Sequence, residues 1–285
     1  MVKFMMQRIF DILPHAETIT SRANATVVSL GKLSLAKHRA EQGLFLAEGI
    51  KLSEEAAGME EIRYILIRSD DGTADAHTLA IARRAPRSAR VLVLPTQVFE
   101  KISTENAPQG IITVLAPLSR IHRTLSAEDC DDIPVEKRIL AVDSVQDPGN
   151  LGTIIRTAAA FGYERILLGH CADIYHPKTV RAAMGTLFRM PVDVCDSLTR
   201  RLLMIRKSGR RVLSAALGDN SLTLGQDPLR ADDCIVIGNE GHGVRASILS
   251  ASDGVIRIPM APNTESLNAA GAAAVLMWEY YRTFG

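Results

Sequence analysis

Cysteine and aromatic residues are scarce in this sequence. Four cysteines are separated by 41, 24 and 39 positions, and phenylalanine, tryptophan and tyrosine together make up 5% of the residues. Such spacing fits neither a zinc-binding pattern nor a small disulfide scaffold, so we expect reduced thiols and no metal site. Few aromatic side chains also leave few platforms on which flat rings could stack.

Long apolar runs and an excess of one charge are also missing. The longest apolar candidate, residues 269–278, is about half of the roughly 18 residues that suggest a membrane-spanning helix. Residues 1–10 are interrupted by Lys3, Gln7 and Arg8 and do not resemble a signal peptide. The 33 basic and 32 acidic residues leave a formal charge of +1, so any basic surface must be local. We expect a cytoplasmic protein without membrane contact.

The remaining composition, 47% hydrophobic and 23% charged over 285 residues, is that of a globular chain. Its length exceeds the roughly 100–200 residues typical of one domain, so we expect two domains. Residues 20–117 alternate short apolar strands with helical patterns, which predicts a small α/β domain. Residues 118–137 show no sustained periodicity and predict a linker. Residues 138–285 predict a parallel sheet covered by helices on both faces.

The apolar runs give the expected strands of both domains. In a parallel sheet, ligands bind beyond the carboxyl ends of the strands, so the segments that follow the strands of the second domain are of most interest. The expected strands are residues 43–47, 62–68, 90–94 and 110–115 in the first domain, and 139–143, 165–168, 190–194, 211–216, 234–238 and 255–259 in the second.

The first of these segments runs from Asp143 to Arg156. Asp-Pro-Gly-Asn at 147–150 is a strong turn signal, and apolar residues then recur at helical spacing from Leu151 onward. Arg156 lies about 140° around this helix from Leu151, away from the apolar stripe. Asn150 and Arg156 are therefore either a helix cap and a solvated side chain or parts of a ligand site, and spacing alone leaves both interpretations open.

The second segment, residues 235–243, is a buried strand that runs into a loop with three glycines. Glycine lets backbone N–H groups approach a ligand closely, so a small-molecule cradle at this strand end is one interpretation. The order of Gly238, Gly241 and Gly243 is not the G-x-G-x-x-G pattern of dinucleotide-binding proteins. His242 in this loop is a weaker candidate, because a loop histidine is more often a surface residue than a catalyst.

The third segment is residues 256–268. It places Ser266, Leu267 and Asn268 at the start of an alanine-rich helix. These residues either cap that helix or form part of a site. The small residues on the helix would also permit close approach of a partner helix, which favours a subunit contact there.

The order of the three segments is more informative than any one of them. Asn150 with Arg156, then Ile-Gly-Asn-Glu-Gly at 237–241, then Ile-Pro-Met at 258–260 and Glu-Ser-Leu-Asn at 265–268 closely resemble the signature motifs of the SpoU (TrmH-like) RNA methyltransferases of the SPOUT superfamily. Residues 178–189 also look like this family. The similarity spans about residues 138–283. In the first domain, residues 43–49 and 106–110 resemble the ribosomal-protein-like substrate-binding domain that often precedes this catalytic domain.

This resemblance implies S-adenosylmethionine as methyl donor and a ribose 2′-hydroxyl of rRNA or tRNA as acceptor. It also implies an α/β fold whose C-terminal parallel-sheet domain contains a trefoil knot, and a homodimer formed through that domain. Carried over by position, the catalytic residues are Asn150, Arg156, Glu240, Ser266 and Asn268. The residues that would bind the donor are Gly238, Asn239, Gly241, Ile258, Met260 and Leu267.

Arg156 is the first catalytic candidate. Arginine stays protonated in proteins, so we expect it to bind RNA phosphate and stabilise a developing alkoxide, and the proton acceptor stays unassigned. Arg181, Lys37 and Arg39 are candidate RNA contacts. Six cations between residues 197 and 211 either bind phosphates or form a solvated helix face.

Two other functions compete with RNA methylation. A non-catalytic RNA-binding protein with the same fold would not need to keep the catalytic set, and all five residues are present. A dehydrogenase is disfavoured by the reversed glycine spacing and by the lack of an early glycine-rich turn.

Overall fold

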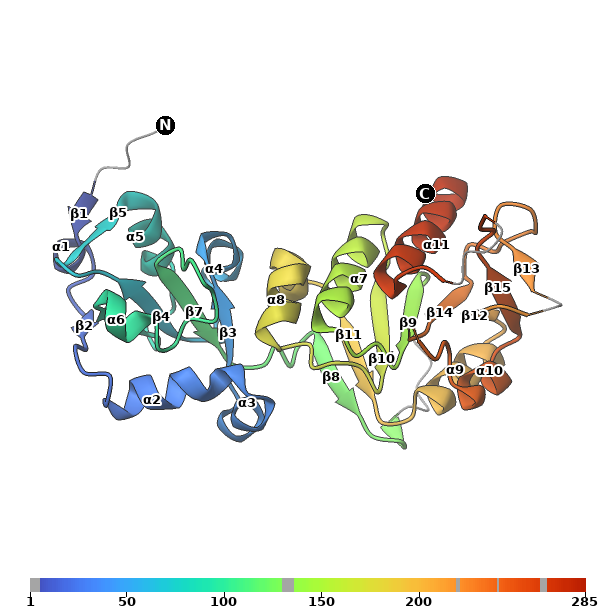
Figure 1. Ribbon diagram of the computed structural model, residues 1–285, viewed down its shortest axis with the longest axis horizontal. Coiled ribbons are helices and arrows are strands. Elements are labelled where there is room, and N and C mark those ends of the chain that lie inside the picture. The colour runs from blue at the N-terminus through green and yellow to red at the C-terminus, as the bar shows by residue number, and fades with distance from the viewer. Residues whose placement is uncertain (1–5, 130–135, 219–220, 240, 262–265) are drawn as a thin grey trace. The chain divides into compact units, whose positions relative to one another are not determined.

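The computed structural model describes residues 6–129, 136–218, 221–239, 241–261 and 266–285. The chain forms two compact units. Unit 1 comprises Met1–Leu118 and Tyr175–Phe188, and unit 2 comprises Ser119–Ile174 and Arg189–Gly285. Figure 1 shows the elements of both units.

Unit 1 is an α/β unit around a five-stranded mixed sheet. Strand β4 is the central strand, since it pairs in parallel with β6 and antiparallel with β7. The strand order is β2 (Glu17–Thr18), β6 (Arg90–Leu94), β4 (Ile62–Arg68), β7 (Ile111–Leu115) and β3 (Phe45–Glu48). The remaining elements are β1 (Met6–Arg8), α1 (Ile9–Ile12), α2 (Ala25–Gly31), η1 (Lys32–Ser34), α3 (Ala36–Gln42), α4 (Ile50–Ala56), β5 (Thr73–Asp75), α5 (Ala76–Arg83) and α6 (Thr96–Phe99).

The core of unit 1 forms where α2 and η1 meet the sheet. Leu30 and Leu33 pack with alternate strand residues such as Leu66 and Leu92, all 2% exposed or less. Because side chains of a strand alternate between faces, this pattern fixes the register of each strand. All four strands expected in residues 20–117 are present, two of them at the predicted bounds.

One segment of unit 1 comes from the middle of the C-terminal half. It contains α8 (Pro177–Ala183) and η3 (Met184–Phe188), which connect two strands of unit 2. The Tyr175 ring stacks on Phe45 with 4.3 Å between centroids, and its hydroxyl accepts a hydrogen bond from Leu118 N at 2.8 Å. A Cβ at Gly185 would overlap the side chain of Glu55. The sequence predicts residues 138–285 to be one domain. In the structure, the connection between β10 and β11 in this range packs in unit 1 instead.

Unit 2 contains an eight-stranded sheet in which every pairing is parallel. This confirms the α/β fold with a parallel sheet that the apolar runs predicted. The strand order is β13 (Leu222–Thr223), β15 (Gly254–Arg257), β12 (Val212–Ala215), β14 (Cys234–Ile237), β9 (Ile139–Asp143), β10 (Arg165–Gly169), β11 (Val192–Cys195) and β8 (His122–Leu125).

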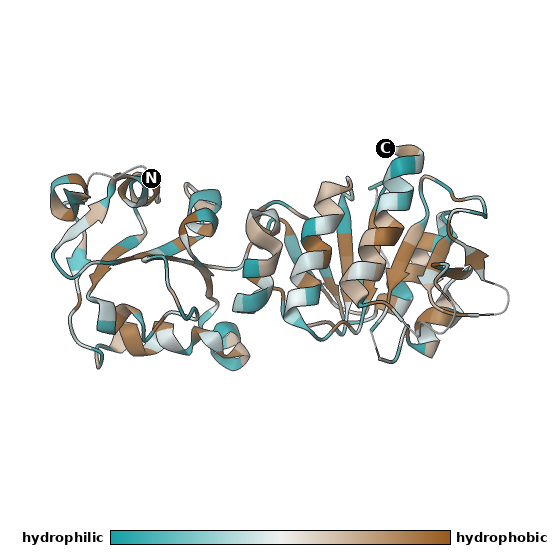
Figure 2. Cartoon of the chain, turned by 45° about the horizontal axis from the view of Figure 1, so that its top comes forward, coloured by the Kyte–Doolittle hydropathy of each residue, from teal (hydrophilic) through white to brown (hydrophobic). Residues whose placement is uncertain are grey.

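Helices cover both faces of this sheet (Figures 1 and 2). Helices α7 (Pro148–Ala160) and α11 (Ala269–Phe284) lie on one face and contact each other, and α9 (Leu198–Lys207) and α10 (Ala246–Ala251) lie on the other. The strands are hydrophobic along their length in Figure 2, because both faces are buried. The strand order reverses between β9 and β14, which is where open α/β sheets form ligand crevices.

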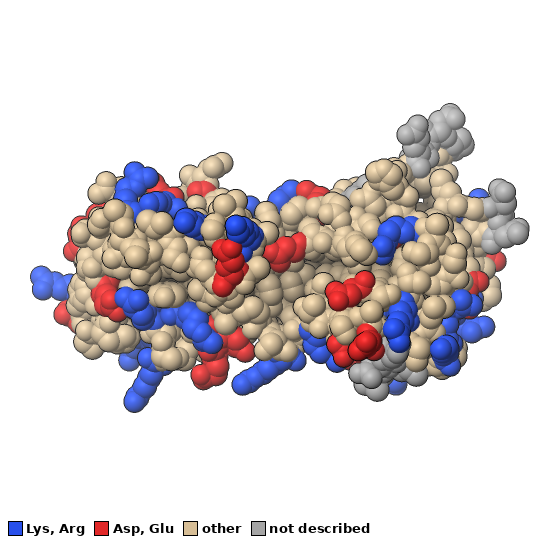
Figure 3. Space-filling view, turned by 90° about the horizontal axis from the view of Figure 1, so that it is seen from below, with Lys and Arg blue, Asp and Glu red and all other residues tan. Residues whose placement is uncertain are grey.

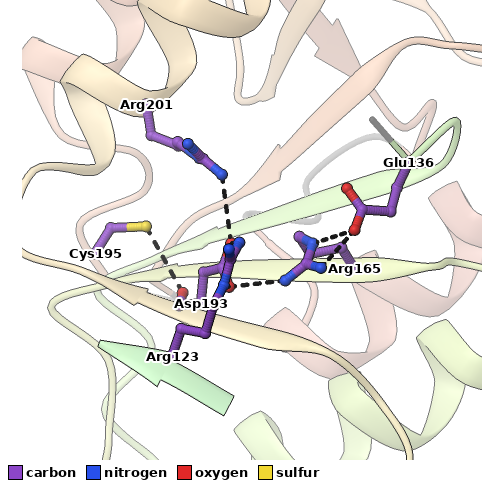
Figure 4. Close-up of polar contacts among 6 residues, drawn as sticks. All are labelled: Arg123, Glu136, Arg165, Asp193, Cys195 and Arg201. Carbon is purple, nitrogen blue, oxygen red and sulfur yellow. Dashed lines mark hydrogen bonds and ion pairs between the residues drawn. The ribbon is translucent and has the colours of Figure 1, made fainter. Parts of the chain in front are cut away.

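Strand β8 lies within the range 118–137 that the sequence predicted to be a linker. Only its first and last residues are buried, so its polar sequence gives no strand signal. Arg123 in β8 donates two hydrogen bonds of 2.8 Å to the buried carboxylate of Asp193 in β11. Arg165 and Arg201 converge on the same carboxylate, and Arg165 also pairs with Glu136 (Figure 4). This charge cluster, defined by Asp193 and its three arginines, attaches β8 to the sheet edge.

Candidate active site

A cavity of about 670 Å³ opens beyond the carboxyl ends of β12, β14 and β15 in unit 2. Its volume lies within the roughly 300–1,000 Å³ of typical small-molecule sites. The second and third segments of the sequence analysis supply most of its wall. Seven of the predicted site residues line it, namely Gly238, Asn239, Gly241, Ile258, Met260, Ser266 and Leu267.

The glycine loop after β14 is folded back tightly on itself. A Cβ at Gly238 would lie 2.5 Å from the carbonyl carbon of Gly243, so only glycine fits there. The side chain of Asn239 shapes the same loop: its Oδ1 accepts from the N–H groups of Gly241 at 2.9 Å and His242 at 3.1 Å. Its Nδ2 donates to the carbonyl oxygen of Ser144 at 3.0 Å. Asn239 therefore holds the wall in place, and the backbone of the loop faces the cavity.

A buried ion pair fixes the strand end next to this loop. Asp143, at the end of β9, is fully buried and lies 2.6 Å from the guanidinium of Arg245. The backbone N–H of Arg245 donates to the same carboxylate at 3.0 Å. Hydrogen bonds thus fix Asn239 and Arg245, one near each end of the glycine loop. Nothing beside Arg245 in the sequence indicates this contact, and the charged Asp143 at the end of a buried strand is its one signal.

The start of α7 meets the start of α11. Asp147 is the N-cap of α7 and accepts from the N–H of Asn150 at 2.8 Å. The Asn268 side chain caps α11 and also donates to Oδ1 of Asn150 at 3.2 Å. Asn268 thus caps a helix, as one of the two interpretations predicted, and its side chain joins the first segment to the third.

Arg156 is exposed on α7, whereas Leu151 and the apolar stripe are buried, as the helical spacing predicted. Within the part of the chain that the structure describes, its guanidinium has no hydrogen bond or ion pair. It does not line the cavity. The side chain is therefore available to a ligand outside the cavity walls. Glu240, predicted beside Asn239, lies outside the described residues.

The RNA-contact candidates divide into two accessible residues and one buried one. The side chain of Lys37 is 80% exposed, 3.8 Å from Glu41, and that of Arg181 is 45% exposed and paired with Glu105. Arg39 is buried, and its guanidinium donates to the carbonyl oxygens of Leu33 and Ser34 at 2.9 Å. The expectation that Arg39 contacts RNA is therefore wrong, because its charge serves to satisfy backbone carbonyls inside unit 1.

Three of the six cations between residues 197 and 211 are paired with acidic side chains. Arg201 belongs to the charge cluster of Asp193, Arg206 pairs with Asp253 at 2.8 Å and Arg211 pairs with Asp233 at 2.6 Å. The acids come from distant positions, which is why the sequence shows only cations. This finding favours the structural interpretation of the run.

Within the described residues, no group of three or more His, Cys, Asp or Glu side chains is arranged to hold a metal ion. No helix in the same ranges has the length and apolar character required to cross a membrane.

Comparisons with known proteins match both halves of the chain. A model described as the SpoU rRNA methylase family matches residues 137–278, and a model of an MRM3-like substrate binding domain matches residues 24–113. A 23S rRNA (guanosine(2553)-2′-O)-methyltransferase, RlmP of Bacillus subtilis, is 32% identical over 262 residues, which cover 91% of this chain and 97% of the relative.

Solved structures are similar over nearly the full length. The AdoMet-bound rRNA methyltransferase from Sinorhizobium meliloti has a TM-score of 0.80 and 27% identity, with 95% of this chain and 99% of that chain covered. A structure described as an RNA 2′-O ribose methyltransferase has a TM-score of 0.75 and 28% identity, with 93% and 98% covered.

Proposed function

We infer the function of this chain from the premise that it belongs to the SpoU rRNA methylase family. It is an S-adenosylmethionine-dependent RNA methyltransferase that methylates a ribose 2′-hydroxyl of rRNA or tRNA. The observation that carries this function is the cavity at the carboxyl ends of β12, β14 and β15, where the second and third segments meet and the first is joined through Asn150. A non-catalytic RNA-binding role is not favoured.

The cavity fits the donor. Ile258, Met260 and Leu267 offer apolar surface for an adenine ring and a methionine chain, and the loop from Gly238 offers backbone donors and acceptors. When bound, S-adenosylmethionine supplies the activated methyl group. The chain itself must bind the donor, exclude water and present the ribose oxygen in line with that methyl, so positioning dominates the rate enhancement.

Arg156 supplies a charge for the RNA side of the reaction. Its exposed guanidinium can bind a phosphate through two hydrogen bonds and stabilise the ribose oxygen as it loses its proton. Asn150 and Asn268, joined by their 3.2 Å hydrogen bond, orient the first turns of α7 and α11 and, with Ser266, offer hydrogen bonds to the ribose. Glu240 is assigned to this set by its position in the family motif.

Unit 1 contributes RNA binding in this proposal. Its match to a substrate binding domain and the exposed cations Lys37 and Arg181 support this role. On the face shown in Figure 3, basic and acidic side chains alternate without a large field of one sign. RNA recognition on that face would therefore depend on local contacts.

An exposed aromatic patch on α7 and α11 supports the homodimer. Trp278 and Tyr281 are 50% and 42% exposed, and both contact Phe161 with ring centroids less than 6 Å away. Large apolar side chains gathered on one helix face favour burial against a second copy. Sedimentation should show a dimer that Trp278→Glu converts to monomer, whereas Leu35→Glu, at another exposed apolar residue, has no effect. A monomeric wild-type protein contradicts the dimer.

The cellular location follows from the same reasoning. Cys171, Cys195 and Cys234 are free thiols, as expected for a reducing compartment, and we infer a cytoplasmic protein. The trefoil knot stays a prediction from the family resemblance.

Methyl transfer to total RNA tests the function. Purified protein is incubated with tritiated S-adenosylmethionine and either ribosomal or transfer RNA, and the RNA is digested to nucleosides. We expect label in 2′-O-methylnucleosides of ribosomal RNA, the substrate named for the RlmP relative. Label in transfer RNA alone contradicts the ribosomal assignment, and no transfer to either contradicts the activity.

A further inference from the structure

Unit 1 contains a second, smaller cavity of about 160 Å³. Three segments form it: the first turn of α4, the loop that precedes β7, and the end of the α8 segment. Leu52, Ala107 and Met184 supply its apolar wall, one from each segment. All of its lining residues belong to unit 1, so the cavity is a feature of that unit alone.

Two residues from the family-like segments of the first domain make this cavity rigid. The carboxylate of Glu48 accepts from the N–H of Thr104 at 2.8 Å and from its hydroxyl at 2.9 Å, and also from the hydroxyl of Ser103. Oε1 of Gln109 accepts from the N–H of Ile50 at 2.9 Å, which leaves its NH₂ group as a donor. Loop and helix are thus fixed to each other, and the cavity is preformed.

The charges that line the cavity cancel. Arg181 and Lys51 carry positive charge, and Glu48 and Glu105 carry negative charge. A cavity without net charge is a poor site for a phosphate, but a mixture of donors and acceptors suits the edge of a heteroaromatic ring. An apolar cavity of about 150 Å³ binds benzene, so this volume suits one flat ring. The thioether of Met184 favours contact with such a ring.

The backbone at Met184 is strained. Its φ of 52° and ψ of −157° are in a region that residues other than glycine rarely occupy. Such strain persists where the surrounding structure requires it, often at binding sites. Met184 follows α8, and the same connection begins after Gly169 at the carboxyl end of β10. Met184 therefore lies in unit 1, on the connection that leaves unit 2 after β10.

We propose that the small cavity receives one unpaired base of the substrate RNA, distinct from the nucleotide that is methylated. This inference rests on the proposed function of unit 2 for its substrate class. The base would lie between Leu52 and Met184, with its edge toward Arg181 and Gln109. Apolar contact with Leu52 and Met184, together with hydrogen bonds at the base edge, would hold the substrate in register.

The first test fills the cavity. Ala107 is exposed, so Ala107→Phe adds a ring without disturbing the core, and Ala40→Phe on α3 is the matched control at an exposed alanine elsewhere in unit 1. For full-length protein we expect Ala107→Phe to raise KM for ribosomal RNA about tenfold, with kcat and donor affinity unchanged. If Ala107→Phe and Ala40→Phe agree within twofold, the base site is overturned.

The second test removes the base from the RNA. Each RNA in a set of short substrates carries one abasic nucleotide, at a different position in each RNA. We expect a single position, other than the modified one, to lose about tenfold in kcat/KM with wild-type protein and nothing further with Ala107→Phe. Equal losses in both proteins at every position overturn the proposal.

A readout without catalysis separates this proposal from the proposed function. The ¹³C-methyl signal of Met184, assigned by its loss in Met184→Leu, should shift when ribosomal RNA fragments are added, and should not shift in Ala107→Phe. A shift without methyl transfer would contradict the activity and support the base site. Transfer without a shift would leave the activity intact and overturn the base site.

Discussion

The unit 2 sheet has one edge at the amino ends of its strands and another at their carboxyl ends, and the two carry different side-chain chemistry. Toward the amino ends, the buried Asp193 contacts three arginines, and Asp233 receives Arg211 and the hydroxyl of Tyr280 at 2.7 Å. Toward the carboxyl ends lie the glycine loop and the cavity. Arg156, eight residues after the start of α7, has no partner in the described chain. Asp193 and Asp233 at the amino ends are paired within the fold, whereas Arg156 is left for a ligand.

In one sheet, the side chains that stabilise the fold are thus separate from those available to a ligand. Buried ions that pair within the chain fix strand positions, and an exposed ion without a partner costs little and can bind a substrate. On the cavity side, the pair of Asp143 with Arg245 likewise fixes the end of the glycine loop.

The largest effect is expected at Arg156, on the rate of methyl transfer. Arg156→Ala should lower kcat for methyl transfer by about 10²–10³-fold, as found when one stabilising donor of a developing oxyanion is removed. Its donor affinity, measured by calorimetry, should match wild type because Arg156 does not line the cavity. Loss of donor binding along with activity would place Arg156 in the cofactor site instead.

Asp193→Asn should have the next largest effect, on stability alone. Removing one partner of a buried ion pair costs about 3–5 kcal/mol, so denaturant unfolding should show a loss of about that size. Donor affinity of the folded fraction should not change. The control is Glu17→Gln, which removes an exposed pair with Arg90 and should cost less than about 1 kcal/mol. Similar losses in both variants would mean that the cluster of Asp193 adds no more than a surface pair.

Gly238→Ala should affect donor binding with a smaller effect on folding. The added methyl group would meet the backbone of Gly243 and Val244, and relieving such an overlap costs about 1–3 kcal/mol. We expect donor affinity to fall about tenfold or more in calorimetry. Gly271→Ala on α11 is the control, since a Cβ there meets no other group within 4 Å. Unchanged affinity in Gly238→Ala would mean that the loop does not form the donor site.

The smallest effect concerns two thiols, the half-buried Cys171 near the carboxyl ends of the strands and the buried Cys234 near the amino ends. Burial raises the pKa of Cys171, beyond the carboxyl end of β10, and that of Cys234, at the start of β14, to about 12. Unfolded thiols ionise near pH 8.5, so the stability that these protonated thiols contribute is complete below that pH and is lost as the pH rises toward 12. Stability should therefore decline above about pH 9.

Alkylation of the same thiols compares the edges directly. At pH 8 we expect Cys171 to react with iodoacetamide faster than Cys234, through local opening of the loops at the cavity edge. Mass spectrometry of the labelled peptides gives the two rates. Equal rates would indicate that both edges open only with the whole unit.

The sequence predicted ten of the fifteen strands in the described residues, because these ten are largely buried runs of apolar residues. It missed β1, β2, β5 and β13, which are two or three residues long. It also missed β8, because two of its four residues are exposed and its attachment depends on Asp193, 70 positions from Arg123. It also missed that residues 175–188 pack in unit 1, since that depends on the Tyr175 stack on Phe45. Local patterns carry no record of such distant partners.

The candidate site shows the same limit. The glycine loop and Asn268 were identified because backbone geometry and helix caps have local signals. Arg39 was misjudged because a basic residue on a short helix looks the same whether it faces solvent or the carbonyl groups of Leu33 and Ser34. Arg245 was missed because nothing in its neighbourhood indicates a pair with Asp143, 102 positions away.

A crystal structure of the chain with S-adenosylhomocysteine, the unreactive product, tests the central claim most directly. The account predicts that the ligand lies beyond β12, β14 and β15, against the loop from Gly238 and the side chains of Ile258 and Leu267, with Arg156 outside its contacts. A ligand found at the opposite edge, beside Asp193 or Asp233, would contradict it.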